Sequence, residues 1–328
     1  MHSPTARRIL KARRLKADLL LIELDTPGGR LDYTTTMCNL IEKSELKTAA
    51  YIRMGKHRGA FSAGAIISLT CGSIYMEPGT SIGSATPFAM TVFGEAKVTE
   101  KMISATSAMA RGLADRHGHS PELAAAMVDP DVELRRVTVQ GKVKCVPPGR
   151  AEWLKKNKGA TLGPWVSRKG KLLALTASEA HEVGLIAAVA TSRDDVLKAL
   201  GMEGAEIVGG RSGGAIAKRI AERDGKLGKL DTAIAAARTK ALAADPNRTV
   251  QRVWDSSGNF VDRGRAWRKQ TDECVRAWDA CLKLLRVKLD YARKYPGLDV
   301  GEEAIKAAMI EIKEYRDKLV RERGRKGI

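Results

Sequence analysis

The chain has 328 residues, of which 44% are hydrophobic and 29% are charged, a composition typical of a globular protein. It is long enough for one large domain or two smaller ones. Its five cysteines show no C-x-x-C spacing, so neither a disulfide framework nor a zinc site is predicted. No apolar run approaches the roughly 18 residues of a membrane-spanning helix, and the basic N-terminal segment has no apolar signal core.

The net charge of +19 raises the question of a nucleic-acid partner. Residues 1–200 contain 29 Lys and Arg against 19 Asp and Glu, which gives +10, and residues 201–328 contain 28 against 19, which gives +9. Because the excess is divided between both parts and mixed with acidic residues, it favours a soluble basic surface over a dedicated nucleic-acid patch. Nucleic acid or anionic membrane is therefore a weak expectation, through the basic C-terminal part.

The first part of the chain alternates predicted strands with predicted helices. A helical pattern over residues 5–15 precedes an apolar run at 17–24, which predicts a buried strand of a parallel sheet. That strand ends in Asp25-Thr-Pro-Gly-Gly-Arg30, where proline and glycine favour a tight turn. Asp32 can cap the next helix, at about 33–43. The later elements are a strand at 48–53, a glycine turn at 55–64, a helix opening behind it, a strand at 73–76, a small-residue loop at 77–87 and a helix at about 98–117.

This repetition of strand, glycine turn and helix predicts an α/β domain with a mainly parallel sheet. In such sheets, binding sites form where loops leave the carboxyl ends of the strands. The loops at 25–30, 55–62 and 77–87 all follow predicted strands. We therefore expect these three loops to face one crevice.

The rest of the chain is predicted to complete this domain and then to become helical. A hairpin at 137–146 that turns at Gln140-Gly141, a helix at about 178–183 and a strand at 185–190 complete a domain over residues 1–206. Residues 207–225 are predicted to be a glycine-rich linker, and residues 226–328 a basic helical extension. A helical hairpin is predicted there from a stripe at steps of three and four: Trp267, Thr271, Cys274, Trp278, Cys281, Leu285 and Ala292, broken by Lys288, then Ile305, Ala308, Ile312, Tyr315 and Leu319.

Ser62 lies where the glycine turn opens a helix. The free backbone N–H groups and the partial positive charge of a helix start can hold an oxyanion there, with the Ala63 amide as one donor. Gly28 and Gly29 can expose a second donor from the neighbouring loop, because they have no Cβ. Taken alone, however, Ser62 is more typical of a helix N-cap.

A serine nucleophile also needs a base. No histidine lies between Ser62 and Arg116, whereas Lys101 lies 101 − 62 = 39 residues after the serine, at the start of a predicted helix. Burial lowers the pKa of a lysine and allows it to act as a base, and Met102, Ile103 and Ala105 could provide an apolar site. His57 is a weaker candidate base. As an isolated residue, Lys101 is more typical of a solvated helix lysine.

In this order and spacing, Asp25-Thr-Pro-Gly-Gly, Ser62-Ala-Gly and Pro78-Gly-Thr-Ser-Ile-Gly-Ser-Ala-Thr-Pro87 resemble the NfeD-type serine proteases of the Clp-protease, signal-peptide-peptidase and crotonase fold group. The likeness continues through Lys101-Met, 127–134 and 171–180 and spans about residues 15–200. It implies a ClpP/crotonase-like fold of repeated ββα units that assembles into a homo-oligomer. It implies a Ser–Lys dyad, and these site residues: Ser62 as nucleophile, Lys101 as general base, the Gly29 and Ala63 amides as oxyanion hole, and Gly28, Ser81 and Ser84 along the substrate cleft.

The resemblance also implies a polypeptide substrate, such as a hydrophobic segment of a membrane-associated protein, and no cofactor. It implies a cell-envelope or membrane-associated location, whereas a true start at Met1 would indicate the cytoplasm. Family members carry a signal segment and a strand ahead of the position of Ala17, so we expect the start of this chain to be truncated or misassigned. Long NfeD proteins continue into membrane spans and a small β-barrel, whereas this chain continues into basic helices.

Other interpretations remain open. Ser81 and Ser84 fit loop or pocket-lining roles better than a nucleophile's role, and Asp129 and Asp131 fit a turn around Pro130 better than a metal site. A crotonase-type acyl-CoA enzyme would use paired amides of the same fold without needing Ser62. A catalytically inactive scaffold would bind partners through the C-terminal helices.

Overall fold

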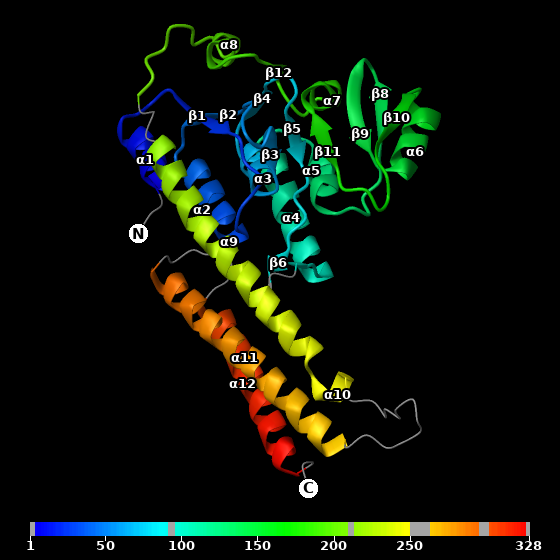
Figure 1. Cartoon of the computed structure of the whole chain (residues 1–328). Helices are drawn as coiled ribbons and strands as arrows, with labels where there is room; N and C mark the ends of the chain where they lie inside the picture. Colours follow the sequence, from blue (N-terminus) through cyan, green and yellow to red (C-terminus); the bar gives the residue numbers. More distant parts are fainter. Residues whose placement is uncertain (1–3, 91–95, 209–212, 250–262, 295–301, 326–328) are drawn as a thin grey trace. The chain divides into compact units, whose positions relative to one another are not determined.

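The structure of the chain, a computed structural model, describes residues 4–90, 96–208, 213–249, 263–294 and 302–325. It separates into two compact units (Figure 1). The first comprises residues 1–88 and 98–210, and the second comprises residues 89–97 and 211–328. In the described part of the chain, no helix is both long enough and apolar enough to cross a membrane.

A parallel sheet in the order β1-β2-β4-β12 forms the centre of the first unit. Its strands are β1 (Leu19–Leu24), β2 (Lys47–Ile52), β4 (Ser73–Met76) and β12 (Ala188–Val189). Along β2, Ala50 and Ile52 pack into the main core, whereas Ala49 and Tyr51 pack into a smaller cluster. This alternation buries β2 on both faces, as expected for a parallel strand with crossover helices. β1 is instead a half-buried edge strand, so the prediction of a buried strand at 17–24 is wrong in this respect.

Helices connect these strands and cover the sheet: α1 (Pro4–Arg14), α2 (Leu31–Glu42), α3 (Ala63–Leu69), α4 (Glu100–Arg116), α5 (Pro121–Val128), α7 (Ala177–Glu182) and α8 (Arg193–Ala199). A second small sheet, β11-β5-β3, contains β3 (Gly59–Phe61), β5 (Ser81–Gly83) and β11 (Ala174–Thr176). β3 and β5 run parallel, and β11 runs antiparallel to β5. The sequence predicts a turn and a loop where β3 and β5 form, because strands of three residues leave too little periodicity to detect.

A three-stranded lobe, residues 134–171, projects from the first unit (Figure 1). It contains β8 (Leu134–Val139), β9 (Lys142–Val146), α6 (Pro148–Lys158) and β10 (Thr161–Ser167), in the sheet order β10-β8-β9. The predicted hairpin turn is confirmed, because Gln140 and Gly141 both have positive φ, 51° and 74°, as a two-residue hairpin of this hand requires. The lobe has its own small core around Val137, Ala151 and Leu154.

Helices form most of the second unit: α9 (Gly213–Ala243), α10 (Pro246–Thr249), α11 (Arg263–Lys294) and α12 (Glu302–Arg325). The short hairpin of β6 (Ala89–Met90) and β7 (Ala96–Lys97) is also assigned to it. The predicted stripe is buried along α11 and α12, which confirms its helical spacing, while its connecting residues 295–299 lie outside the described residues. Lys288 does not break the stripe, because it is buried and pairs with Asp231 of α9 at 2.5 Å.

The predicted linker differs from the structure. α9 begins at Gly213, so residues 213–225 are helical rather than flexible, and residues 209–212 lie outside the described residues. Glycine costs a helix about 1 kcal/mol per residue. Gly213 and Gly214 lie in the first turn, and the good helix formers that follow them, Ala215-Ile-Ala-Lys-Arg-Ile-Ala-Glu, offset this cost.

Candidate active site

Ser62 has a backbone conformation that few non-glycine residues adopt, with φ 53° and ψ −115°. Such a conformation costs about 1–3 kcal/mol and persists only where surrounding contacts enforce it. The Ser62 side chain makes no capping hydrogen bond to α3, although Ser62 occupies the N-cap position. The N-cap alternative is therefore wrong, and the hydroxyl lies on a strained strand-to-helix turn of the kind that presents nucleophiles.

Backbone hydrogen bonds on both sides hold this turn. The Ser62 N–H donates to the Gly83 carbonyl at 2.9 Å, and the Ser62 carbonyl accepts from the Ala65 N–H at 3.1 Å. The preceding Phe61 N–H donates to the Thr26 carbonyl at 3.0 Å, which ties β3 to the loop after β1. The conformation of Ser62 is thus fixed from β5, from α3 and from the first glycine loop.

The glycine loop passes directly over Ser62. A Cβ on Gly28 would lie 2.7 Å from the Ser62 Cβ and 3.1 Å from its Oγ, and Gly28 has a φ of 127°. A Cβ on Gly29 would lie 3.8 Å from the Ala63 Cβ. The structure therefore brings Gly28, Gly29, Ser62 and Ala63 together, as the sequence predicts.

The amides of Gly29 and Ala63 have no acceptor within the described ranges, whereas the Gly28 N–H donates to the Thr26 Oγ1 at 3.1 Å. The Ala63 N–H belongs to the first turn of α3, where N–H groups have no partner within the helix. Two free donors beside a hydroxyl provide the elements of an oxyanion hole.

Ser84 and Ser81 differ in their distance along β5 from Ser62. Phe61 pairs with Gly83 in the parallel register, so Ser62 and Ser84 both directly follow paired residues. Ser84 also has a positive φ, 51°, and its N–H donates to the Leu173 carbonyl at 2.9 Å. Ser81 pairs with Gly59, at the opposite end of β3. Ser84 is therefore a neighbour of Ser62, and Ser81 is not.

Lys101 lies in the first turn of α4 and is exposed. The buried residues of α4 include Thr106, Ala110 and Leu113, and at 100° per residue Lys101 falls outside this stripe. The expectation that neighbouring apolar residues bury Lys101 is therefore wrong, and Ala105 is itself exposed. No hydrogen bond or ion pair joins Lys101 to another residue in the part of the chain that the structure describes.

Two carboxylates that the sequence analysis did not assign hold the loop before Ser62. Asp25 accepts the His57 N–H at 3.0 Å, and a Cβ on Gly55 would lie only 2.1 Å from the Asp25 Oδ2. Glu77 accepts the Tyr51 hydroxyl at 2.6 Å and also binds the Met54 N–H. Their position directly after strands β1 and β4 was the available signal, because acidic residues there can bind loop amides.

Asp129 and Asp131 form a turn, as expected, because the Asp129 Oδ1 accepts the Asp131 N–H at 2.9 Å. Within the described ranges, no group of three or more His, Cys, Asp or Glu residues is placed to hold a metal ion.

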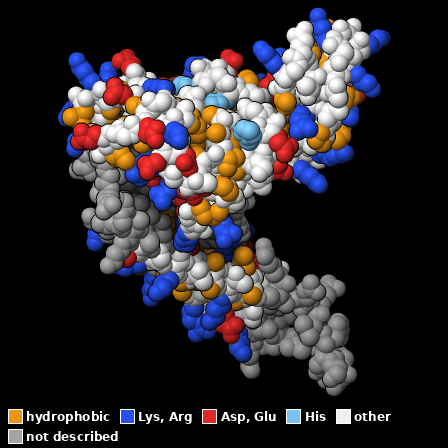
Figure 2. Space-filling model, turned by 90° about the horizontal axis from the view of Figure 1, so that it is seen from above, with side chains coloured by type: hydrophobic (Ala, Val, Ile, Leu, Met, Phe, Trp, Pro, Cys, Tyr) orange, Lys and Arg blue, Asp and Glu red, His pale blue; other side chains and the backbone are white. Residues whose placement is uncertain are grey.

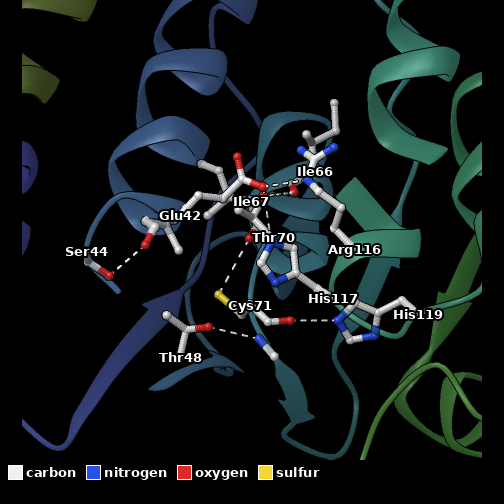
Figure 3. Close-up of polar contacts among 12 residues, drawn as sticks. Glu42, Ser44, Thr48, Ile66, Ile67, Thr70, Cys71, Arg116, His117 and His119 are labelled. Carbon is white, nitrogen blue, oxygen red and sulfur yellow. Dashed lines mark hydrogen bonds and ion pairs between the residues drawn. The ribbon is translucent and has the colours of Figure 1, made fainter. Parts of the chain in front are cut away.

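A cavity of about 390 Å³ lies at the other end of the parallel strands, the amino end, where Lys47 and Ser73 begin β2 and β4. Figure 3 shows the polar contacts beside it. The Glu42 carboxylate accepts from Arg116 at 2.8 Å and lies 3.3 Å from the His117 Nε2. The His119 Nε2 lies 2.7 Å from the Cys71 carbonyl oxygen. These contacts join α2 and α3 to the end of α4, so we interpret this end of the strands as structural.

Comparison with known proteins finds relatives that resemble the first unit. Residues 3–161 match the family model described as NfeD1b, N-terminal domain. The chain is 30% identical to the membrane protein NfeD1b of Bacillus subtilis over an alignment of 203 residues. The aligned region covers 62% of this chain and 38% of that protein. The chain is also 30% identical to the membrane-bound protease PH1510 of Pyrococcus horikoshii over 161 residues. That alignment covers 47% of this chain and 35% of that protein. The chain thus spans well under half the length of both curated relatives.

Two solved structures can be compared. One is a lysine-to-alanine variant of the 1510-N membrane-bound stomatin-specific protease in complex with a substrate peptide. It is 26% identical, with a TM-score of 0.43, over 58% of this chain and 69% of that chain. The other is ClpP1 from Listeria monocytogenes, 14% identical with a TM-score of 0.34, over 60% and 85% of the two chains. The family match confirms the resemblance predicted from the sequence, and residues 3–161 are similar to the N-terminal domain of the NfeD1b family.

Proposed function

We propose that the chain is a serine peptidase in which Ser62 is the nucleophile. The observation that carries this proposal is the strained Ser62 turn, whose hydroxyl makes no capping bond and lies beside two amides that have no acceptor among the described residues. The similarity to a protein named a membrane-bound protease supports it. Strain at a residue that does not cap its helix is hard to explain as a structural feature, because a capping conformation would be more stable.

In the proposed reaction, the Ser62 Oγ attacks the carbonyl carbon of the scissile peptide and Lys101 accepts the hydroxyl proton. The carbonyl oxygen becomes an oxyanion that accepts hydrogen bonds from the Gly29 and Ala63 amides. Lys101 then donates its proton to the departing amine, which leaves an acyl group on Ser62. Water, deprotonated by Lys101, hydrolyses this ester and restores both side chains.

Lys101 must be neutral to accept a proton, and a solvated lysine is charged at neutral pH. Since Lys101 is exposed in the free chain, the proposal requires that bound substrate or a second copy of the chain covers it and removes water from it. A homo-oligomer, as the family resemblance implies, would provide such a cover.

The proposed substrate is a hydrophobic polypeptide segment, such as one from a membrane-associated protein. Large exposed apolar side chains follow each loop at the carboxyl ends of the strands: Leu31 and Tyr33 after the glycine loop, Met54 after β2 and Phe88 after the small-residue loop. Exposed apolar residues that follow loops at one end of a sheet favour a surface that binds apolar partners. The similarity to a protein named a membrane-bound protease supports a membrane-associated substrate for this chain.

The test is cleavage of unstructured and hydrophobic peptides by the purified full chain, with Ser62→Ala and Ser81→Ala compared. We expect Ser62→Ala to abolish cleavage and labelling by a serine-directed phosphonate, whereas Ser81→Ala retains both. Cleavage by Ser62→Ala at the parental rate would refute the mechanism. A thermal shift with acyl-CoA, without phosphonate labelling, would favour the crotonase-type alternative.

A further inference from the structure

The positive charge of the first unit is concentrated in the three-stranded lobe. Residues 134–171 contain eleven Lys and Arg and one acidic residue, Glu152, so the lobe carries 11 − 1 = +10. The other residues of the range 1–200 then contain 29 − 11 = 18 basic and 19 − 1 = 18 acidic residues, which gives zero. The interpretation that the excess is spread over the chain is therefore wrong for residues 1–200, because a division at residue 200 averages over the lobe.

Most of these cations have no counter-ion among the residues that the structure describes. Arg135 pairs with Glu152 at 3.5 Å, and Arg136 pairs with Glu182 at 3.2 Å. The other nine make no ion pair with any residue that the structure describes, and all nine are exposed: Lys142, Lys144, Arg150, Lys155, Lys156, Lys158, Arg168, Lys169 and Lys171. Figure 2 shows basic side chains around the projecting lobe, with acidic ones gathered elsewhere on the first unit. Unpaired like charges repel one another, so such a cluster favours binding of an anion.

Two tryptophans lie among these cations. Trp153 is 43% exposed, and the Arg150 guanidinium lies 4.1 Å from its ring centroid. Trp165 has the guanidinium groups of Arg135 and Arg168 at 5.7 Å and 4.8 Å. Trp165 is half-buried, so Trp153 is the exposed ring of the two. An exposed aromatic ring among cations is typical of surfaces on which nucleic-acid bases stack while the cations bind phosphates.

A structural explanation accounts for part of the cluster. β9 is an edge strand, and lysines on an edge strand prevent pairing with another chain. This explanation covers Lys142 and Lys144. It does not cover the four cations of α6 or the three of residues 168–171, which lie outside the edge strands, so seven of the nine unpaired cations are left unexplained.

The distribution of these cations distinguishes two kinds of polyanion. They come from β9, α6 and the turn after β10, so they surround the lobe rather than form one flat face (Figure 2). A flat bilayer would contact one side of the lobe, and the large exposed apolar residues described there are Val143 and Trp153. Membrane binding scales with buried apolar area, whereas a single strand can bend around a basic surface. We propose that the three-stranded lobe binds single-stranded nucleic acid, with its lysines on phosphates and Trp153 stacked on a base.

The test measures fluorescence anisotropy of a labelled 20-nucleotide oligothymidylate with the full chain at several salt concentrations. The variant K155Q/K156Q/K158Q removes three cations from α6, and K269Q/K283Q/K313Q removes three exposed lysines from α11 and α12 as a matched control. We expect the α6 variant to bind at least tenfold more weakly and to lower the salt slope by about 2, since each phosphate contact on a single strand contributes about 0.7. We expect less than a twofold change for the control.

Trp153 provides a second, independent readout. Trp153→Ala is expected to weaken binding at least threefold, and Trp153→Phe is expected to retain most of the affinity, because a phenyl ring still stacks. Ser62→Ala should bind like the parent, which separates this proposal from the peptidase. Failure to bind the oligonucleotide, equal weakening by both triple variants, or salt-sensitive binding to anionic phosphatidylserine vesicles in its place would overturn the proposal. Circular dichroism of each variant establishes that the lobe is folded.

Discussion

The two ends of the central parallel strands, called here the carboxyl edge and the amino edge, differ in whether their polar groups have hydrogen-bond partners. At the carboxyl edge, Ser62 is strained and the amides of Gly29 and Ala63 lack acceptors among the described residues. At the amino edge, Glu42 holds Arg116 and His117, and His119 binds the Cys71 carbonyl (Figure 3). The strain at the carboxyl edge thus costs folding free energy, whereas the contacts at the amino edge stabilise the fold. This division is expected of an active site, where strain must be enforced by the surrounding structure.

Lys101 is neither strained nor held by a described hydrogen bond or ion pair, so its substitution gives the strongest test of whether activity and stability reside in different groups. We expect Lys101→Met to lower kcat/KM by about 10³-fold, since general bases contribute roughly 10²–10⁴-fold. The melting temperature should not change, because the side chain is exposed and makes no described contact. Peptide cleavage and thermal unfolding measure the two quantities. For the parent chain, kcat/KM should rise between pH 6 and 10, and a flat profile would contradict a lysine base.

Gly28→Ala tests whether the carboxyl edge is pre-organised. Its Cβ would collide with the Ser62 Cβ, and its φ of 127° disfavours any side chain. We expect kcat/KM to fall by about 100-fold, because small displacements of reacting groups have effects of this size, and stability to fall by about 2 kcal/mol. Gly29→Ala is the matched control, since its Cβ makes an ordinary contact at 3.8 Å. It should stay within a few-fold of the parent, and equal losses in the two variants would contradict the model of the site.

The sequence predicted the elements that have strong periodicity. β4, the hairpin at 137–146 and the stripe of α11 and α12 lie where the pattern indicated, because each has several buried residues at a fixed spacing. α6 and β10 were missed, because α6 buries few residues and carries mostly lysine and arginine outside. The burial of Lys288 also contradicts its pattern, because the partner Asp231 lies more than 50 positions earlier in the sequence.

The candidate site was predictable where it depends on the backbone. Gly28, Gly29, Ser62 and Ala63 come together because the strands before them are neighbours, and strand adjacency follows from the alternation of elements. The environment of Lys101 was not predictable, since the orientation of a helix decides whether its first turn is covered. The separation of Ser84 from Ser81 also required the register of β5 against β3, which three-residue strands do not reveal in sequence.

A substitution at the amino edge should lower stability and leave activity unchanged, whereas one at the carboxyl edge should chiefly lower activity. Glu42→Gln removes the charge that pairs with Arg116 and His117, groups that are one quarter to one half exposed. We expect a loss of roughly 1 kcal/mol in unfolding free energy, since solvent weakens partly exposed pairs. The rate of peptide cleavage should be unchanged. Urea unfolding and the peptide assay check this, and a large loss of activity at equal stability would show that the two edges are coupled.

The pH dependence of stability should show the smallest effect and should originate at the amino edge. Burial lowers the pKa of His119 in the folded chain, although its hydrogen bond to Cys71 opposes the shift. As pH falls below about 6.5, the unfolded chain therefore binds a proton that folded His119 does not, and stability decreases. For Glu42, burial acts to raise the pKa, but the hydrogen bonds from Arg116 and His117 outweigh it and lower the pKa. Its contribution is present above the ordinary carboxyl value of 4.5 and is lost as pH falls further.

Melting temperatures between pH 8 and 3 should consequently decline in two steps, and His119→Gln should flatten the step that begins near pH 6.5 while leaving the lower one. Ser62→Ala is the control from the carboxyl edge, and its profile should follow that of the parent. A first step that survives in His119→Gln would place the titrating group elsewhere. If Ser62→Ala flattened the profile instead, the amino edge would not be the source of acid sensitivity, and the assignment of stability to one edge and chemistry to the other would fail.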